Sequence, residues 1–526
     1  MLDWIKNALS LRFRRASAAD RASRTRLDGW MHAAIGCRQA GDDTQAQELC
    51  RRILDEAPDH ADALYLLGEI AAEHSDHDEA IGLIRRSISI ASDRPQFHYA
   101  LGCVLGASGD WRGAMESYRS ALALSSSHAG AHLNLGCILQ ARGEIDAAED
   151  FLRDHATREL DEALMHFRAV ADIAPGHPDG WINLGYAMAR RGNLENALLY
   201  YERALAIDAG LAQAQFSRSM VLLAQGQFSA GWDAYEWRWQ ASGFPKPEFR
   251  QPEWDGSAVD RKTVFLYTEQ GFGDAIQFAR YATLVAARGA QVILRCPPEL
   301  TRLLGTVPGV TRTLASQDPM PDFDFHCPLL SLPRVLRTTV DTIPAAVPYL
   351  RAEPEKKDEW RKLLDDGASG IKIGLVWASQ SQFPGAELKS MALESLGPLR
   401  RLAGATFYSI QMGAAGRQAA TPGAPIAVHD LTGRIRDFTD TAALIDNLDL
   451  TLSVDTAVAH LAGAMGKPVW TILPYAADWR WEPRAAPGKW YPTMRLYRQT
   501  NRGDWVSVLS QVANDLQQHF HLRLLP

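Results

Sequence analysis

The sequence predicts an α plus α/β architecture in which an array of helical repeats is followed by two doubly wound lobes. Small residues recur every 34 positions through the first 240 residues, and short β-rich runs alternate with helical stretches after a proline-rich joint. A chain of 526 residues that is 46% hydrophobic is also too long for a single core. We therefore expect several domains.

Two rows of small residues define the repeats. The first row contains Ala34, Gly68, Gly102, Gly136, Gly185 and Ser219. The second row lies 12 residues further along in each unit and contains Ala46, Ala80, Ala114, Ala148, Ala197 and Gly231. This spacing predicts helix pairs that cross at small residues and that need stacked neighbours to bury their apolar faces.

One step of the array is longer than the others. Gly136 and Gly185 are 49 residues apart, which is 15 more than the period, and both Ala148 and Ala163 suit the second small-residue position. We expect a lengthened helix there, either as a contact for the second half or a partner, or as an inert insertion. The last repeat ends in GWDAYEWRWQ, whose aromatic side chains we expect to plug the boundary with the next domain, with a carbohydrate-stacking site as the alternative.

The predicted domains are a helical cap at 1–25, about six repeats at 26–242, a linker at 243–260, a first lobe at 261–350 and a second lobe with a C-terminal helix at 351–526. The arginine-rich start also suits a membrane-surface helix or a presequence, although no apolar run reaches the roughly 18 residues of a membrane span. The net charge of -7 gives no basic footprint for nucleic acid. Six cysteines without C-x-x-C spacing indicate reduced thiols, so we expect a cytoplasmic protein with no stable membrane insertion.

The first candidate loop is Glu269–Asp274, which follows an apolar strand. Gly271 and Gly273 would let the backbone approach a ligand closely. The third glycine of a dinucleotide fingerprint is missing, so we do not expect NAD. Asp274 begins a predicted helix, where it suits either an N-cap or a catalytic carboxylate.

The second candidate loop, 453–460, joins a strand to a helix rich in small residues. Thr456 and His460 are four residues apart and share one face of that helix, close to its positive end, which suits a phosphate group. The alternative is that Asp455 or Thr456 caps the helix and that His460 packs internally.

The third candidate loop, 474–481, contains Asp478 and several aromatic residues. We expect the aromatic rings to stack on a base or a sugar, with a place in the core or at its rim as the alternative. No group of His, Asp or Glu has convincing metal-ligand spacing, so we expect no metal.

These patterns resemble known families. The 34-residue units resemble tetratricopeptide repeats, which commonly hold an extended peptide or a helix and therefore imply a protein partner. The stretches EQGFGDAIQFARY, DFTDTAALIDNLDLTLSVDTAVAHLAGAMGKPVW, LPYAADWRWEP and WYPTMRLYRQ resemble bacterial proteins in which such repeats precede a heptosyltransferase-like domain. That resemblance implies the GT-B fold, a pair of Rossmann-like lobes, over most of residues 261–505.

The resemblance also implies roles for site residues. The acid after the first-lobe glycines, Asp274, would be the general base on the acceptor side. The second lobe would hold the donor's nucleotide and phosphates, through Asp455, Thr456 and His460. Lys389 precedes Ser390 where the family has a basic residue, but Trp377–Gln380 reads WASQ where the family usually has WSGN, which leaves the donor open. We include Gly271, Gly273 and Asp478 among the predicted donor-binding residues.

We therefore predict a bacterial protein O-glycosyltransferase that is metal-independent and needs no cofactor besides its sugar-nucleotide co-substrate. Some relatives with this arrangement modify flagellin with nonulosonic acids, which makes flagellin a candidate acceptor and a CMP-linked sugar a candidate donor. The alternatives are a glycolipid transferase, a repeat scaffold with an inactive or sensing lobe pair, and a transferase for an adhesin or a pilin. A homo-oligomer is compatible with the repeats.

Overall fold

The computed structural model describes residues 23–146, 153–243, 245–365, 370–380, 387–420, 424–482, 484 and 487–524. The chain divides into two compact units, Met1–Gln140 with Asp161–Gly180 and Ala141–Leu160 with Trp181–Pro526. A helix runs over residues 23–39, so most of the expected cap and its membrane-surface alternative lie outside the described residues. Over the described part of the chain, no helix combines the length and apolarity needed to cross a membrane.

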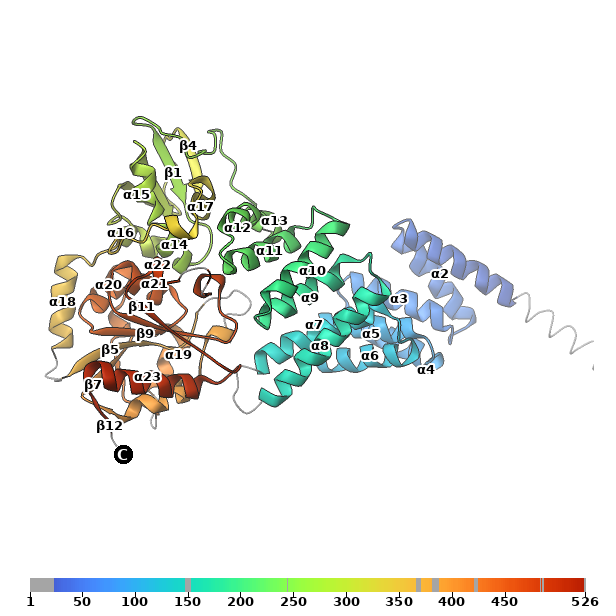
Figure 1. Cartoon of the computed structure of the whole chain (residues 1–526). Coiled ribbons are helices and arrows are strands. Elements are labelled where there is room, and N and C mark those ends of the chain that lie inside the picture. Colours follow the sequence, from blue (N-terminus) through green and yellow to red (C-terminus); the bar gives the residue numbers. More distant parts are fainter. Residues whose placement is uncertain are drawn as a thin grey trace, which may run out of the picture. The chain divides into compact units, whose positions relative to one another are not determined.

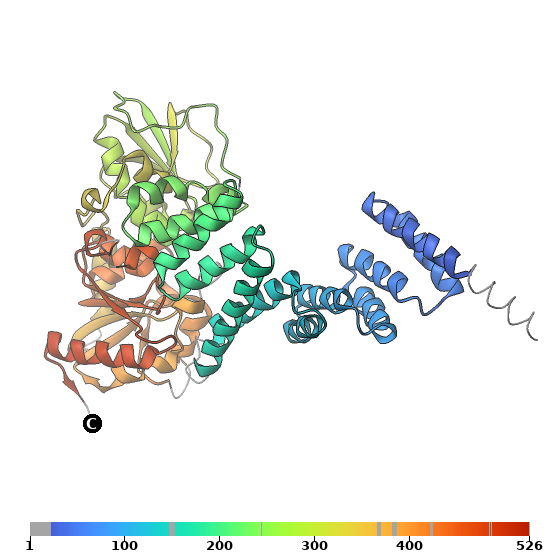
Figure 2. The same cartoon turned by 45° about the vertical axis from the view of Figure 1, so that its right-hand side comes forward.

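Antiparallel helix pairs make up the first unit and continue into the second (Figures 1 and 2). Helix 23–39 precedes α2 (Asp43–Glu56), and the pairs that follow are α3 (Ala61–Glu73) with α4 (His77–Ile90), α5 (Pro95–Ala107) with α6 (Trp111–Leu124), α7 (Ala129–Asp146) with α8 (Arg153–Ile173), α9 (Pro178–Arg190) with α10 (Leu194–Ile207), and α11 (Ala212–Ala224) with α12 (Phe228–Tyr235) and the short α13 (Arg238–Ala241). The predicted tetratricopeptide-repeat fold is confirmed.

The helices of a pair cross where the sequence has its small residues. A β-carbon on Gly102 would lie 2.5 Å from the ring of Tyr118, and one on Gly185 would lie 2.6 Å from the ring of Tyr201. Ala114, which belongs to the second row, is fully buried in the same crossing. The 34-residue period therefore records where two backbones come close together.

The turn inside most pairs also repeats. Gly41, Gly109 and Gly192 have positive φ angles, and each is followed by an Asp or Asn whose side chain accepts a hydrogen bond from the first turn of the next helix. Glycine adopts the left-handed conformation without strain, and Asp and Asn are strong N-caps. These two residues end one helix and begin the next.

The irregular step lies inside the pair formed by α7 and α8. Gly143 and Glu144 stand where other repeats have the turn residue and its capping Asp or Asn, and α7 continues through them to Asp146. A β-carbon on Gly136 would lie 2.7 Å from the ring of Phe167, four residues after the buried Ala163. Ala163 therefore fills the second small-residue position, whereas Ala148 lies outside the described residues. The extra length is shared between α7 and α8, because both are longer than the other repeat helices.

The first lobe is built on a four-stranded parallel sheet of order β3-β2-β1-β4. Its strands are β1 (Thr263–Tyr267), β2 (Gln291–Cys296), β3 (Val310–Ala315) and β4 (Phe325–Pro328). Its helical segments are α14 (Phe272–Phe278), α15 (Tyr281–Ala286), η2 (Pro298–Leu300), α16 (Thr301–Leu304), η3 (Leu329–Ser331), α17 (Leu332–Val335) and η4 (Val340–Thr342).

The second lobe is built on a six-stranded parallel sheet of order β11-β10-β9-β5-β7-β8. Its strands are β5 (Ile371–Val376), β7 (Ala405–Ser409), β8 (His429–Asp430), β9 (Leu450–Val454), β10 (Val469–Leu473) and β11 (Met494–Arg498), and β6 (Leu402–Ala403) pairs separately with β12 (Arg523–Leu524). The chain order reverses between β5 and β9, which is where parallel sheets of this kind bind ligands.

Helices cover both faces of the second sheet (Figure 1). One face packs against α18 (Pro354–Leu364), α20 (Phe438–Asp446) and α21 (Ala457–Ala464), and the other packs against α23 (Trp505–Phe520) and η6 (Leu393–Arg401). The remaining short elements are η5 (Glu387–Lys389), α19 (Gly413–Arg417), η7 (Gln418–Ala420), η8 (Thr432–Arg434), η9 (Trp479–Trp481) and α22 (Pro487–Trp490). The predicted pair of Rossmann-like lobes is confirmed.

The last helix pair packs directly on the lobes within the second unit. Trp232 of α12 is buried, and its ring meets the rings of Trp479 and Phe278 edge to face at 5.4 and 6.1 Å. Tyr235 is buried beside Trp232. The aromatic plug predicted from GWDAYEWRWQ is confirmed for these two residues.

Candidate functional site

The loop after β1 holds Asp274 at the third position of α14. The backbone N–H of Gly271 donates a hydrogen bond to Oδ2 of Asp274 at 3.2 Å, so the carboxylate closes the start of its own helix. Burial raises the pKa of Asp274, and the nearby Arg480 guanidinium offsets this only in part. A carboxylate with a raised pKa is better matched to accepting a proton near neutral pH.

Arg480, from the loop after β10, brings the two lobes together at Asp274. Its guanidinium forms an ion pair with Oδ1 of Asp274, donates to Oδ1 of Asp478 at 2.8 Å, and donates from Nε to Oε1 of Gln277 at 2.6 Å. Gln277 is fully buried on α14. The first-lobe helix and the third loop are therefore joined by one arginine, and Asp478 serves this arginine as a partner.

The loop after β9 places Asp455 against Lys389. The ammonium of Lys389 lies 2.6 Å from Oδ2 of Asp455, and the imidazole Nε2 of His460 lies 3.8 Å from Oδ1. Burial acts to raise the pKa of Asp455, but the charge of Lys389 and its hydrogen bond outweigh burial and the pKa is lowered. Asp455 is thus an ionised carboxylate that orients Lys389.

Thr456 occupies the N-cap position of α21. Its hydroxyl lies 3.0 Å from the hydroxyl of Ser453, and among the described side chains none accepts a hydrogen bond from the first turn of this helix. Thr456 is therefore the N-cap residue that the alternative expects, but its side chain does not cap the first turn. The N–H groups of this first turn and the positive end of the helix dipole suit an anion.

His460 is buried on the second turn of α21. Its Nδ1 lies 2.9 Å from the hydroxyl of Tyr491, and the ring of Trp481 covers it at 5.3 Å between centroids. Burial lowers the pKa of His460 to about 3, so the imidazole is neutral at physiological pH. Gly273 of the first lobe faces this ring.

The WASQ segment after β5 is held by side-chain acceptors. The N–H groups of Trp377 and Ala378 both donate to Oε1 of Gln411, and the N–H of Ser379 donates to Oγ of Ser390 at 2.9 Å. Trp377 itself is buried. This segment and Lys389 lie at the carboxyl end of β5, beside the point where the order of the strands reverses.

The third loop corrects one expectation. Trp479 and Trp481 are both buried, Trp479 against the aromatic residues of α12 and Trp481 against His460. They complete the core, and their rings are not available for stacking on a base or a sugar. Over the described residues, no three His, Cys, Asp or Glu side chains are arranged so that they could hold a metal ion.

The structure brings most of the predicted site residues together in two clusters of charged groups that the sequence did not reveal. Asp274 and Asp478 meet at Arg480, whereas Asp455 and His460 meet beside Lys389. Their roles on a donor or an acceptor stay predictions.

Sequence reasoning missed Arg480, Gln277 and Tyr491. Arg480 carried a usable signal, because it is a cation between two tryptophans in a loop already selected for its position after a strand. Tyr491 lies in the stretch WYPTMRLYRQ, but nothing in the sequence pairs it with a histidine 31 residues earlier.

Comparisons with known proteins match the repeats and part of the second lobe separately. Residues 38–95, 99–159 and 178–210 match tetratricopeptide-repeat profiles, and residues 409–487 match the profile of glycosyltransferase family 9 (heptosyltransferase). Protein FlbA of Caulobacter vibrioides is 27% identical over 386 residues, which cover 68% of this chain and 64% of FlbA. The chain thus spans just under two thirds of that curated relative.

Two solved structures resemble the repeats. The pilF protein of Pseudomonas aeruginosa is 14% identical, with 42% of this chain and 95% of that chain covered and a TM-score of 0.36. YrrB, described as a TPR protein with an unusual peptide-binding site, is 22% identical. The match covers 36% of this chain and 90% of YrrB, with a TM-score of 0.29. The family 9 match contains Asp455, His460 and Arg480 and follows the repeats in the sequence. The chain therefore carries tetratricopeptide repeats followed by a glycosyltransferase family 9 domain.

Proposed function

We propose that this protein is a glycosyltransferase that moves a sugar from a nucleotide-activated donor to a Ser or Thr hydroxyl of a protein held by the repeats. One observation carries the proposal: Asp274, on a first-lobe loop, lies against Arg480 from the lobe that matches family 9. A carboxylate with a raised pKa at the meeting point of two lobes is suited to act as a general base.

In the proposed reaction, the acceptor oxygen forms a bond with the anomeric carbon of the sugar while the bond from that carbon to the donor phosphate breaks. The acceptor's proton passes to the carboxylate of Asp274, and the electron pair of the broken bond leaves on the phosphate oxygen. General-base catalysis typically contributes about 10²- to 10⁴-fold. Arg480 would move from Asp274 toward the substrates or would hold the carboxylate in line with the hydroxyl.

Lys389 and the start of α21 would receive the negative charge of the leaving phosphate. About a third of the Lys389 side chain is exposed (34%), so its ammonium retains N–H donors for a ligand besides its contact with Asp455. The first turn of α21 adds backbone N–H groups and the helix dipole. This set of groups supports a metal-independent GT-B mechanism.

The finer assignments follow from the family resemblance. We propose a CMP-linked nonulosonic acid as the donor and flagellin as the acceptor, in the cytoplasm of a bacterium, and the repeats would raise the local concentration of the acceptor. The described cysteines are all free thiols, which supports a reducing compartment. A homo-oligomer formed through the repeats is compatible with this role.

A repeat scaffold with an inactive or sensing domain is the second candidate. It is favoured by the two ion pairs, because Asp274 with Arg480 and Lys389 with Asp455 satisfy one another without a substrate. A glycolipid transferase or an adhesin or pilin transferase would use the same residues and differ in the acceptor.

The first test is a thermal-shift panel of CMP-, UDP-, GDP- and ADP-sugars. A ligand at 100 times its Kd should stabilise the protein by about 2.7 kcal/mol. We expect one nucleotide class to shift the wild type and to lose its effect in Lys389→Ala. The control is Lys467→Ala. This variant breaks the ion pair between Lys467 and Asp446, which belongs to the same lobe but lies away from the site. Asp274→Asn should keep the shift and lose transfer, whereas a well-folded protein that binds none of the four would favour the scaffold.

A further inference from the structure

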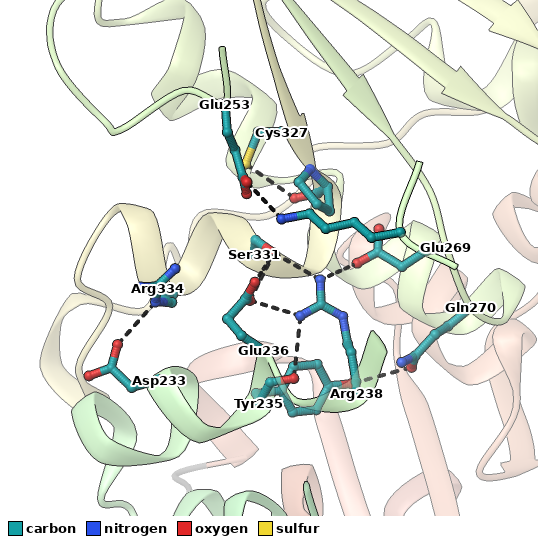
Figure 3. A network of polar contacts seen from close by, with 12 residues as sticks. Asp233, Tyr235, Glu236, Arg238, Glu253, Glu269, Gln270, Cys327, Ser331 and Arg334 are labelled. Carbon is teal, nitrogen blue, oxygen red and sulfur yellow. Dashed lines mark hydrogen bonds and ion pairs between the residues drawn. The ribbon is translucent and has the colours of Figure 1, made fainter. Parts of the chain in front are cut away.

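A buried arginine of the last repeat lies at the centre of a polar network that reaches the first lobe (Figure 3). Arg238 donates to Oε1 of Glu236 at 2.8 Å, to Oε1 of Glu269 at 2.8 Å and to the hydroxyl of Ser331 at 2.8 Å. Ser331 in turn donates to Glu236 at 2.8 Å. Only 3% of the Arg238 side chain is exposed, so these contacts exclude water.

Two neighbouring residues of the first-lobe loop are held by this end of the repeats. Glu269 accepts from Arg238, and the amide oxygen of Gln270 accepts from the hydroxyl of Tyr235 at 3.3 Å. Gly271, which follows directly, donates its backbone N–H to Asp274. A side-chain contact with the repeats is therefore continuous with the hydrogen bond that fixes the candidate base.

Helix α12, which carries Tyr235, also supports Arg480, the other member of the Asp274–Arg480 ion pair. Trp232 and Phe228 of α12 pack edge to face on the ring of Trp479, at 5.4 and 6.2 Å between centroids. Trp479 precedes Arg480, whose guanidinium lies 4.8 Å from the centre of its ring. One element of the last repeat thus contacts both loops that meet at Asp274.

We infer that Arg238 is a positioning residue, which fixes the loop 269–274 and thereby sets the place of Asp274 relative to Arg480. The catalytic part of this inference rests on the proposed role of Asp274 as the base. The effect of Arg238 on the position of the loop does not depend on that role. The last repeat would then be part of the transferase centre as well as the end of the acceptor-binding array.

Arginine suits this task better than any other residue. Its planar guanidinium can donate in several fixed directions at once, whereas a lysine ammonium is a point donor on a flexible stem. Two carboxylates share this one cation, and one oxygen of Glu269 is buried without a partner among the described residues. Such an arrangement is a poor source of stability, which favours a role in fixing geometry.

The test compares Arg238→Gln with Asp233→Asn. Asp233 lies on α12, the helix that precedes the one carrying Arg238, and pairs with Arg334 of the first lobe at 3.1 Å, but this exposed contact does not touch the loop. Hydrogen exchange of the full-length protein is followed by mass spectrometry. We expect Arg238→Gln to raise exchange in residues 268–278 by about tenfold or more and to leave β9 and β10 unchanged. Asp233→Asn should leave all of these peptides as in the wild type.

Kinetics give the second measurement. With the sugar nucleotide that shifts the wild type, Arg238→Gln should lower kcat by about 10- to 100-fold while the KM for the donor changes by less than about threefold, because the base is displaced and the donor groups are not. Adding Glu269→Gln to Arg238→Gln should cause little further loss, since Arg238 acts on the loop through Glu269.

Each outcome of these experiments supports or overturns the positioning role of Arg238. Unchanged exchange in 268–278 in a folded Arg238→Gln protein would overturn the inference, as would an equal rise in Asp233→Asn. If Arg238→Gln fails to fold, Tyr235→Phe removes only the bond to Gln270, and exchange at 268–278 must still rise for the inference to stand. If the wild type proves inactive with every donor, the proposed function fails while the exchange result still decides the positioning role.

Discussion

Gly273 of the first lobe faces His460 of the second so closely that a β-carbon at residue 273 would lie 3.0 Å from Cδ2 of the imidazole. The imidazole has little freedom to move away, because it is hydrogen-bonded to Tyr491 and covered by Trp481. A glycine at this position therefore lets the loop that carries Asp274 approach the helix that begins at Ala457.

The first prediction is that Gly273→Ala separates the two loops. A methyl group would push residue 273 away from His460 by a few tenths of an ångström and would move the adjacent Asp274. We expect turnover to fall by about tenfold or more, because catalysis is sensitive to small displacements of reacting groups. Gly271→Ala is the matched control, since its β-carbon would meet Asp274 at an ordinary 3.5 Å. Equal activity in the two variants would show that the close approach is unimportant.

A second prediction concerns the pH dependence of activity. Arg480 lowers the pKa of Asp274, whereas the carboxylate of Asp478 raises it. A base must be ionised to accept a proton, so the rate should rise with pH through the pKa of Asp274. Arg480→Gln should therefore move the acid limb of the pH–rate profile to higher pH, and Asp478→Asn should move it to lower pH.

The opposite signs make this experiment informative. A general loss of structure would lower the rate in both variants without moving the acid limbs of their pH–rate profiles in opposite directions. Limbs that move in the same direction, or that do not move, would remove Asp274 from the role of base. The measurement is kcat/KM against pH with the donor that binds the wild type.

The third prediction tests the crossings of the repeats. Gly102→Ala would place a β-carbon 2.5 Å from the ring of Tyr118 and should destabilise the first unit by about 1 to 3 kcal/mol through overpacking. Gly106 lies one turn further along the same helix, and a β-carbon there would have contacts no closer than 3.8 Å. Gly106→Ala should leave stability unchanged or raise it by up to about 1 kcal/mol, because alanine favours helix. Urea denaturation followed by circular dichroism measures both, and a Gly102→Ala variant as stable as the wild type would contradict the packing.

The repeats and the alternation of strands and helices could be predicted from the sequence because their signals are local. A glycine every 34 residues reports a crossing between neighbouring helices, and the apolar runs at 263–267 and 450–454 report buried parallel strands. The place of the extra 15 residues was undecided, because Ala148 and Ala163 have the same chemistry. The contact of Gly136 with Phe167 decides between them.

The pairing of charges at the site could not be predicted in the same way. Asp274 and Arg480 are 206 residues apart, and Lys389 and Asp455 are 66 apart. Which acid meets which base depends on how two lobes and a repeat helix pack, and no periodicity in the sequence records that. The network around Arg238 is of the same kind, since its partners come from the last repeat, from the loop after β1 and from η3.

That network supplies the last prediction, on stability against pH. Burial raises the pKa of Glu269 from 4.5 to about 7, and Arg238 does not compensate fully because it is shared with Glu236. The folded protein therefore holds this proton more tightly than the unfolded chain, so the stability of the wild type should fall as the pH rises from about 4.5 to about 7. Glu269→Gln has no proton to lose and should gain about 1 to 3 kcal/mol relative to the wild type between pH 5 and pH 8.

The control for this prediction is Asp324→Asn. A backbone N–H from Thr263 and the ammonium of Lys262 lower the pKa of Asp324, so its contribution to stability is lost only when the pH falls below about 4. Its difference from the wild type should stay constant between pH 5 and pH 8, whereas that of Glu269→Gln should grow. If Glu269→Gln became more stable than the wild type at neutral pH and yet lost turnover, Glu269 would be kept ionised for the position of the loop, at a cost in stability.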